Sequence, residues 1–196
     1  MTQELPSIVT PITYQSVINA LLLAWPNDVD ITRAAVRLAA AQIAIESGLK
    51  YCRAYNVSGI KARVNGAYNW QFFATREFYN AAQLADAKAK GPLNILTIAA
   101  DGRTEVMLQP RHPYCCFRAF TDLQTAMADH LQTLRMKFPY AWGGLLTGNP
   151  DNFAIGLHAD NYFTAPEKSY ADGLKWRWNE EVKAVTDADL VWGDVI

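Results

Sequence analysis

The stretch AAQIAIESGLKYCRAYNVSGIKA, from Ala40 to Ala62, joins an alanine-rich helical pattern to an irregular segment. Apolar side chains recur at spacings of three and four residues from Val36 to Ile43, which predicts an amphipathic helix with one buried face. Gly48 stands where helices commonly end on a glycine. The stretch therefore predicts a helix that stops directly after a glutamate, Glu46.

Glu46 has two features of a weak acid. It lies three residues after Ile43 and seven after Ala39, so it projects from the apolar face of the helix or from the edge of that face. It also lies in the last turn, where the helix dipole is negative. Both circumstances raise the pKa of a carboxyl group, and a glycosidase needs an acid that keeps its proton near neutral pH. The alternative is a solvated Glu46 paired with Lys50 or Arg53.

The composition limits the class of protein. With 196 residues, 51% of them hydrophobic, the chain suits one domain with a substantial core. The formal net charge is -1 and there is no basic run, so we expect no nucleic-acid partner. The three histidines match no metal-ligand spacing, so we expect no metal. Three cysteines, with Cys115 and Cys116 adjacent, do not form a disulfide framework.

The apolar runs carry charges and are too short to span a membrane, so we expect no membrane insertion. Residues 1–15 lack the basic region and apolar run of a classical secretory signal. We therefore expect synthesis in the cytoplasm without such a signal.

Hydrophobic patterning predicts helices at both ends of the chain and a β region between them. TYQSVINALLLAW, up to Pro26, predicts the first helix, and Asp30 or Thr32 caps the second. In the C-terminal half, Thr121 and Gln124 have the spacing of a capping box. Further helices are expected after Asn149-Pro150 and around Leu174, Trp178 and Val182.

The β region lies near the middle of the chain. NWQFFATREFY is rich in residues that favour strands, and NAAQLADAKAK predicts a short helix that stops at Gly91-Pro92. NILTIAADGRTEVMLQ predicts a hairpin that turns at Asp101-Gly102. Together the elements predict an α+β fold that is mostly α.

The stretch from Ala40 to Ala62 resembles the signature of the flagellar-rod and autolysin type of peptidoglycan hydrolase, glycoside hydrolase family 73, of the lysozyme-like superfamily. In that family a helix ends in glutamate-serine-glycine, and asparagine-x-phenylalanine-glycine-isoleucine-lysine follows. The resemblance implies a lysozyme-like helical domain with a small β-lobe beside a groove. It also implies an endo-β-N-acetylglucosaminidase that cuts the glycan strand of the bacterial cell wall without a cofactor.

Three further segments extend the resemblance in the order that the family has. TREFY, Thr75 to Tyr79, is similar to its threonine-x-glutamate-tyrosine strand. FRAFTDLQTAMADHL, Phe117 to Leu131, is similar to its phenylalanine-arginine-x-tyrosine stretch and the following helix. NYFTAPEKSYADGL, Asn161 to Leu174, is similar to its glycine-tyrosine-x-threonine-x-proline and tyrosine-alanine pattern. The similarity runs across residues 35–180, and we expect residues 1–196 to form a single domain with an insertion in the β-lobe at about 63–116.

The resemblance assigns roles to residues of this chain. Glu46 matches the general acid, Glu77 the second acidic residue of the β-lobe, and Tyr162 a tyrosine near the catalytic glutamate. The residues that match the turn of the groove floor are Asn56, Ser58, Gly59, Ile60 and Lys61. Tyr55 and Trp70 belong to an aromatic cluster between the two acids and are candidates to stack on sugar rings.

The chain departs from the family at several places. Ser58 replaces the usual phenylalanine, and Asn161 replaces the usual glycine before the tyrosine. The insertion also makes Glu105, after Thr104, an alternative second carboxylate. We prefer Glu77 because an aromatic residue follows it in the TREFY stretch.

The chemistry that the resemblance implies has one fixed step and one open step. Protonated Glu46 donates a proton to the glycosidic oxygen; then either Glu77 activates a water molecule or the substrate's N-acetyl group attacks.

A muramidase or a lytic transglycosylase on the same fold is the alternative enzyme. An inactive glycan-binding component of a phage tail or secretion apparatus is the alternative outside the enzyme class. Peptidoglycan is the expected partner, with a phage particle, secretion machinery or an immunity protein as further candidates. Such a protein would reach the periplasm or the exterior by phage-type release or dedicated export.

Overall fold

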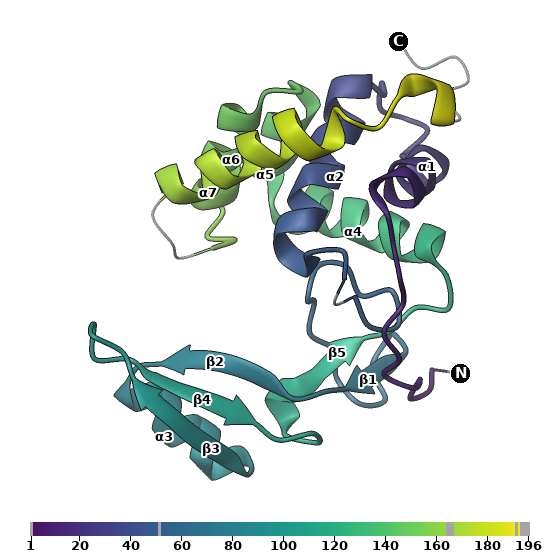
Figure 1. Cartoon of the computed structure of the whole chain (residues 1–196). Helices are drawn as coiled ribbons and strands as arrows, with labels where there is room; N and C mark the ends of the chain where they lie inside the picture. The colour runs from purple at the N-terminus through teal and green to yellow at the C-terminus, as the bar shows by residue number, and fades with distance from the viewer. Residues whose placement is uncertain (1, 51, 164–166, 191, 193–196) are drawn as a thin grey trace. The chain divides into compact units, whose positions relative to one another are not determined.

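The structure is a computed structural model that describes residues 2–50, 52–163, 167–190 and 192. The chain forms two compact units (Figure 1). Unit 1 combines Met1–Ile8 with Gly59–Phe120, and unit 2 combines Val9–Ser58 with Thr121–Ile196. The expectation that residues 1–196 work as a single domain stays a prediction.

Unit 2 is helical. Its helices are α1 (Tyr14–Ala24), α2 (Arg33–Ser47), α4 (Leu123–Lys137), α5 (Pro139–Leu146), α6 (Pro150–Ala159) and α7 (Glu167–Trp176), and a π-helical segment (Arg177–Val182) continues α7. Helix α2 packs against α1, α5, α7 and the π-helical segment, and Figure 1 shows it among the other helices of this unit. Its residues from Leu38 to Ala44 are all buried, which explains the run of alanines: small side chains let neighbouring helices approach closely.

The ends of the helices follow local capping chemistry. Thr32 caps α2 by accepting a hydrogen bond from the backbone of Ala35, and Asn149 caps α6 in the same way, as predicted. The predicted cap at Thr121 is wrong. Asp122 caps α4 by accepting from the backbone of Thr125, because a carboxylate one residue further along reaches the free N–H group.

Unit 1 contains the β region. Strands β1 (Trp70–Phe72) and β5 (Cys116–Arg118) form an antiparallel pair. A second sheet has the order β2-β4-β3, with β2 at Thr75–Tyr79, β4 at Thr104–Leu108 and β3 at Leu93–Ile98. The predicted hairpin at Gly102 and the predicted helix, α3 (Ala81–Lys90), are both confirmed.

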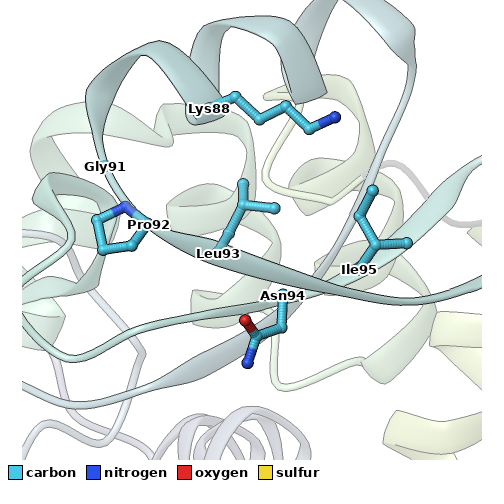
Figure 2. A pocket seen from close by; sticks show the side chains of 6 residues that line it. All are labelled: Lys88, Gly91, Pro92, Leu93, Asn94 and Ile95. Carbon is cyan, nitrogen blue, oxygen red and sulfur yellow. The ribbon is translucent and has the colours of Figure 1, made fainter.

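One face of the three-stranded sheet is covered by α3 and holds the core of unit 1. Val106, Leu108, Cys115 and Phe117 are buried there, and Leu84 of α3 packs against them. Strand β3 lies at the sheet edge and, with α3, lines an open pocket of about 660 Å³. Figure 2 shows the alternation expected of a strand: Leu93 and Ile95 point to the side of α3, and Asn94 points away.

The architecture is the predicted α+β fold, mostly α, with a small β region. No helix among the described residues is both long and apolar enough to cross a bilayer. Cys52, Cys115 and Cys116 are buried thiols rather than disulfide partners.

Candidate active site

Glu46 lies where the sequence predicts it, in the last turn of α2, and Gly48 ends the helix in the left-handed conformation with φ of 57°. The Tyr170 hydroxyl, from α7, donates a hydrogen bond of 2.9 Å to Oε1 of Glu46. The Glu46 side chain reaches solvent, but the protein packed around its carboxyl hinders hydration of the charged form. This burial raises its pKa, and the hydrogen bonds of Tyr170 and Gln42 act in the opposite direction.

Gln42 links Glu46 to a second tyrosine. It lies one helical turn before Glu46, is completely buried, and donates from Nε2 to the Tyr162 hydroxyl at 2.9 Å. Burial and the negative charge of Glu46 both raise the pKa of Tyr162 and of Tyr170 far above the usual range of a phenol. The two tyrosines therefore stay neutral and act as hydrogen-bonding groups around the carboxyl.

Tyr162 is positioned by the end of α6. Its backbone N–H donates to Leu157 and that of Asn161 donates to His158, which is the pattern of a Schellman cap. Asn161 has a φ of 57°, a left-handed conformation that glycine adopts freely and asparagine adopts more easily than most residues. Asn161, where the pattern that the sequence resembles has a glycine, therefore supports the left-handed turn before Tyr162.

Aromatic rings hold both tyrosines in place. Phe163 stacks on Tyr170 with ring centroids 4.1 Å apart, and Phe138 meets Tyr162 edge to face at 5.0 Å. Rings packed in this way restrict the hydroxyl groups to a narrow range of positions. Residues 164–166, which carry part of the threonine-x-proline similarity, lie outside the described residues.

The predicted groove turn follows α2 within unit 2. Asn56 is buried, and its backbone N–H donates to Arg53 at 3.0 Å. Ser58, which replaces a phenylalanine of the family pattern, has its Oγ 2.5 Å from Nδ1 of His130 on α4. Burial lowers the pKa of His130 to about 4, so this buried imidazole is neutral. Tyr55, partly exposed, adopts a positive φ of 52°.

The remaining site residues lie in unit 1. Gly59 has a φ of 61°, which favours glycine. Lys61 donates to the backbone oxygen of Tyr114 at 2.7 Å, and its Nζ lies 3.6 Å from Oε1 of Glu77. Burial lowers the pKa of Lys61, and Glu77 partly offsets that effect. The structure thus brings together Lys61 and Glu77, two residues predicted separately.

Glu77 and Glu105 are not equivalent. In the antiparallel register Glu77 is opposite Val106, so it shares the sheet face that α3 covers. Glu105 is opposite Phe78, on the other face, and its Oε1 lies 3.6 Å from Nη1 of Arg76. The two carboxylates therefore lie on opposite faces of the sheet.

One sequence-based assignment needs correction. Trp70 was expected to stack on sugar, but its ring belongs to the interior of unit 1 and only 7% of the residue is exposed. Its backbone pairs with Gln3 and Leu5 on one side and with Arg118 in β5 on the other. Its neighbour Gln71 is buried as well, so β1 runs through the interior, which an aromatic-rich sequence does not reveal.

Two residues that hydrogen-bond to the Glu46 carboxyl were not predicted from the sequence. Tyr170 appears in the YADGL similarity but is 124 positions from Glu46. Gln42 lies four residues before Glu46, and that spacing was the available signal. In the described part of the chain, no three His, Cys, Asp or Glu side chains gather as a metal site would require.

Comparison with solved structures identifies the fold. A peptidoglycan hydrolase mutant from Sphingomonas sp. A1 aligns with a TM-score of 0.53 and 21% identity, over 87% of this chain and 90% of that one. A C-terminally truncated glycoside hydrolase domain of FlgJ from Salmonella typhimurium aligns with a TM-score of 0.51 and 18% identity, over 88% and 95%. These likenesses confirm the lysozyme-like, mostly helical fold.

Sequence comparison adds nothing further. No family model matches the chain, and no curated protein matches it.

Proposed function

We propose that this protein hydrolyses the β-1,4 glycan strand of peptidoglycan, as an endo-β-N-acetylglucosaminidase with Glu46 as its general acid. The observation that carries the proposal is the set of neutral groups around Glu46: the Tyr170 hydroxyl on Oε1, Gln42 one turn before it, and Tyr162 beyond Gln42. The likeness in fold to structures described as a peptidoglycan hydrolase and a glycoside hydrolase domain supports it.

The first chemical step needs a carboxyl that is protonated when substrate binds. The raised pKa of Glu46 favours that state. Because Tyr170 donates to Oε1, the acidic proton belongs on Oε2, from which it passes to the glycosidic oxygen as the bond to the anomeric carbon breaks. Tyr162, held through Gln42 and Phe138, is suited to contact the sugar beside this oxygen.

The second step completes hydrolysis. In the version that we favour, Glu77 takes a proton from a water molecule, whose oxygen attacks the anomeric carbon from the opposite face and inverts its configuration. In the other version the substrate's own N-acetyl group attacks first, and water then opens that intermediate with net retention. Glu77 lies 3.6 Å from the ammonium group of Lys61, whereas Glu105 lies on the other sheet face beside Arg76.

Replacing Glu46 tests the proposal directly. Glu46→Gln keeps the shape and the hydrogen-bond acceptor but removes the acid, and activity on purified peptidoglycan is expected to fall about 10²–10⁴-fold. Glu180→Gln, an exposed glutamate of the π-helical segment, is the matched control and should clear a zymogram like the wild type. Wild-type activity in Glu46→Gln would refute the role of Glu46.

Mass spectrometry of the products tests which bond is cut. A glucosaminidase leaves N-acetylglucosamine at the new reducing end, and a muramidase leaves N-acetylmuramic acid. A lytic transglycosylase leaves a 1,6-anhydro end instead. A wild-type protein that binds peptidoglycan but clears no zone would support a glycan-binding component of a phage tail or secretion apparatus.

Delivery to the cell wall is part of the proposal. We propose that the protein reaches the cell wall by release of the phage type, or by export through a dedicated machine. A phage particle, a secretion machine or an immunity protein would be the corresponding partner.

A further inference from the structure

A pocket next to Tyr170 takes no part in the proposed proton transfer. It lies within unit 2, where α7 packs against α2 (Figure 1), and its volume is about 390 Å³. Sites for small molecules have volumes of about 300–1,000 Å³, so the pocket is large enough for a small ligand. The described residues that line it are Ile45, Ser169, Tyr170, Gly173, Trp176 and Arg177.

The pocket shares one wall with the surroundings of Glu46. Tyr170 lines it and also donates a hydrogen bond of 2.9 Å to Glu46, and Ile45 directly precedes Glu46 in α2. Phe163 stacks on the Tyr170 ring with centroids 4.1 Å apart, which keeps this wall in place. One aromatic side chain therefore separates the pocket from the proposed acid.

Trp176 gives the pocket an exposed ring. This residue is 54% exposed, whereas a tryptophan of a folded protein is usually well buried. The guanidinium carbon of Arg177 lies 5.7 Å from the centre of the Trp176 ring, and this contact restricts the positions of the indole. An exposed indole held by its neighbour can stack on a flat ligand at a small cost in side-chain entropy.

The charge in the pocket is already neutralised. Arg177 is the one charged residue among the described residues that line it, and its Nη1 donates to Oε2 of Glu181 at 2.6 Å. Ser169 adds a hydroxyl group, which can both donate and accept a hydrogen bond. The lining therefore suits a neutral ligand that combines apolar faces with polar edges.

Gly173 is the residue that packing does not explain. It lies inside α7, where glycine is less favourable than alanine, and it does not adopt the left-handed conformation that would require glycine. A Cβ added to it would meet nothing within 4 Å, so no neighbour excludes a side chain. Because Gly173 lines the pocket, a larger residue there would occupy part of the space that a ligand needs.

The helix also changes its geometry at this pocket. α7 ends at Trp176, and the π-helical segment begins at Arg177, so both lining residues lie at the junction. π-Helical turns are rare and frequently occur at functional sites. This junction lies after the last of the four stretches that resemble the hydrolase family, which ends at Leu174.

We infer that this pocket binds an N-acetylated sugar ring of the glycan strand, away from the bond that is cut, an inference that rests on the proposed function. A pyranose ring has C–H faces that can stack on Trp176 and hydroxyl edges that can bond to Ser169. The methyl group of the N-acetyl substituent suits the aliphatic wall at Ile45. The pocket thus fastens the strand at a second point beside Glu46.

The first measurement locates the ligand. The full chain with Glu46→Gln, which removes the proposed acid, is titrated with the β-1,4-linked tetramer of N-acetylglucosamine. NMR of the isotopically labelled chain follows the indole N–H signal of Trp176, which is assigned by its loss in the Trp176→Phe variant. This signal is expected to shift with the concentration of the tetramer, because the sugar stacks on that ring.

Substitutions then assign the affinity to the pocket. In calorimetry, Gly173→Leu, which fills the pocket, and Trp176→Ala, which removes the ring, are each expected to weaken binding of the tetramer about ten-fold. Trp176→Phe keeps an aromatic face and should retain affinity within about three-fold. All variants carry Glu46→Gln.

Gly143→Leu is the matched control for the filled pocket. Gly143 is an exposed glycine inside α5 of the same unit, and a Cβ there would also meet nothing within 4 Å. This variant should bind the tetramer like its parent. Since Trp176 is largely exposed, Trp176→Ala keeps the test valid even if Gly173→Leu does not fold.

A second ligand tests the role of the N-acetyl group. The β-1,4-linked tetramer of glucose has the same ring faces but a hydroxyl group in place of each N-acetyl group. It is expected to bind about three-fold more weakly or worse, because the methyl contact with the aliphatic wall is lost.

Several outcomes would overturn the inference. A Trp176 signal that does not move would do so, as would unchanged affinity in both Gly173→Leu and Trp176→Ala, or equal affinity for the two tetramers. These readouts are separate from that of the proposed function. A wild-type protein that clears peptidoglycan while its Trp176 signal stays in place would sink the pocket alone. Binding at Trp176 without clearing by the wild type would sink the hydrolase alone.

Discussion

The surroundings of Glu46 in unit 2 differ from those of Lys61 and Arg118 in unit 1. In unit 2, burial favours the neutral forms of Glu46, Tyr162, Tyr170 and His130. It raises the pKa of the carboxyl and of the two phenols, and it lowers the pKa of the imidazole. In unit 1 the charges are met by partners. Lys61 pairs with Glu77, and the guanidinium of Arg118 stacks on Tyr68.

This difference follows from secondary structure. Helices of unit 2 bury their polar groups among aromatic rings and small aliphatic residues, where an ion would lose its hydration. The face of the three-stranded sheet that carries Arg76 and Glu105 is partly exposed, so these opposite charges can pair across strands at little cost. An inverting glycosidase needs two carboxyl groups, a general acid that is protonated and a general base that is ionised.

After that of Glu46→Gln, the largest effect is expected from Glu77 in unit 1. Glu77→Gln should lower the rate of hydrolysis about 10²-fold if Glu77 is the base, and Glu105→Gln, on the other sheet face, should change it little. Rates are measured on purified peptidoglycan by release of reducing ends. Near-normal activity of Glu77→Gln would instead favour attack by the substrate's own N-acetyl group, and the configuration of the first product, read by NMR, distinguishes the two.

Acid should destabilise unit 2 through His130. The folded state holds this imidazole with a pKa of about 4, whereas a histidine in the unfolded chain has its ordinary pKa of 6.5. Between these values the unfolded state binds more protons, so stability falls as the pH drops from about 6.5 to about 4, by up to a few kcal/mol. Urea unfolding at several pH values measures this, and His130→Gln should flatten the dependence in that range. An unchanged slope in the variant would contradict a neutral His130.

A smaller effect is expected at the turn before Tyr162. Asn161→Ala places a residue that disfavours positive φ at 57°, and should lower the stability by about 1 kcal/mol. Asn161→Gly, which restores the residue of the family pattern, should be neutral or slightly stabilising. Thermal unfolding of both variants measures the difference. Equal melting temperatures would show that the left-handed turn does not limit stability.

The smallest effect is expected from the hydrogen bond between Tyr170 and Glu46. The hydrogen bond from Tyr170 lowers the pKa of Glu46 against the larger effect of burial, so Tyr170→Phe should raise that pKa further. The alkaline limb of the pH–rate profile, where a general acid loses its proton, should then move to higher pH by less than about one unit. A shift to lower pH would mean that Tyr170 stabilises the protonated carboxyl.

Local features of this fold were predictable from the sequence, and contacts between distant segments were not. The three- and four-residue spacing before Gly48 predicted α2 and its end, and the alternation on either side of Gly102 predicted the hairpin. These depend on interactions within a few residues. By contrast, Tyr170 meets Glu46 across 124 positions, and no pattern of spacing specifies such a pair.

The same limit explains the errors. Trp70 was a candidate to stack on a sugar ring because aromatic composition does not reveal whether a short strand lies in the interior. Thr121 was predicted as the cap because its spacing to Gln124 fits a capping box, and that spacing does not reveal the extended backbone at residue 122 that makes Asp122 the cap. The choice between Glu77 and Glu105 likewise required the register of β2 with β4.

Both units are assembled from segments that leave the ribosome far apart in time. The backbone of Gln3 and Leu5 pairs with Trp70, and Glu4 forms an ion pair with Arg111. Residues 3–5 therefore cannot form these contacts until much of unit 1 has been synthesised. Glu46 meets its hydrogen-bond donor only after residue 170 has emerged. During translation, the surroundings of the proposed acid are therefore among the last parts of the molecule to form.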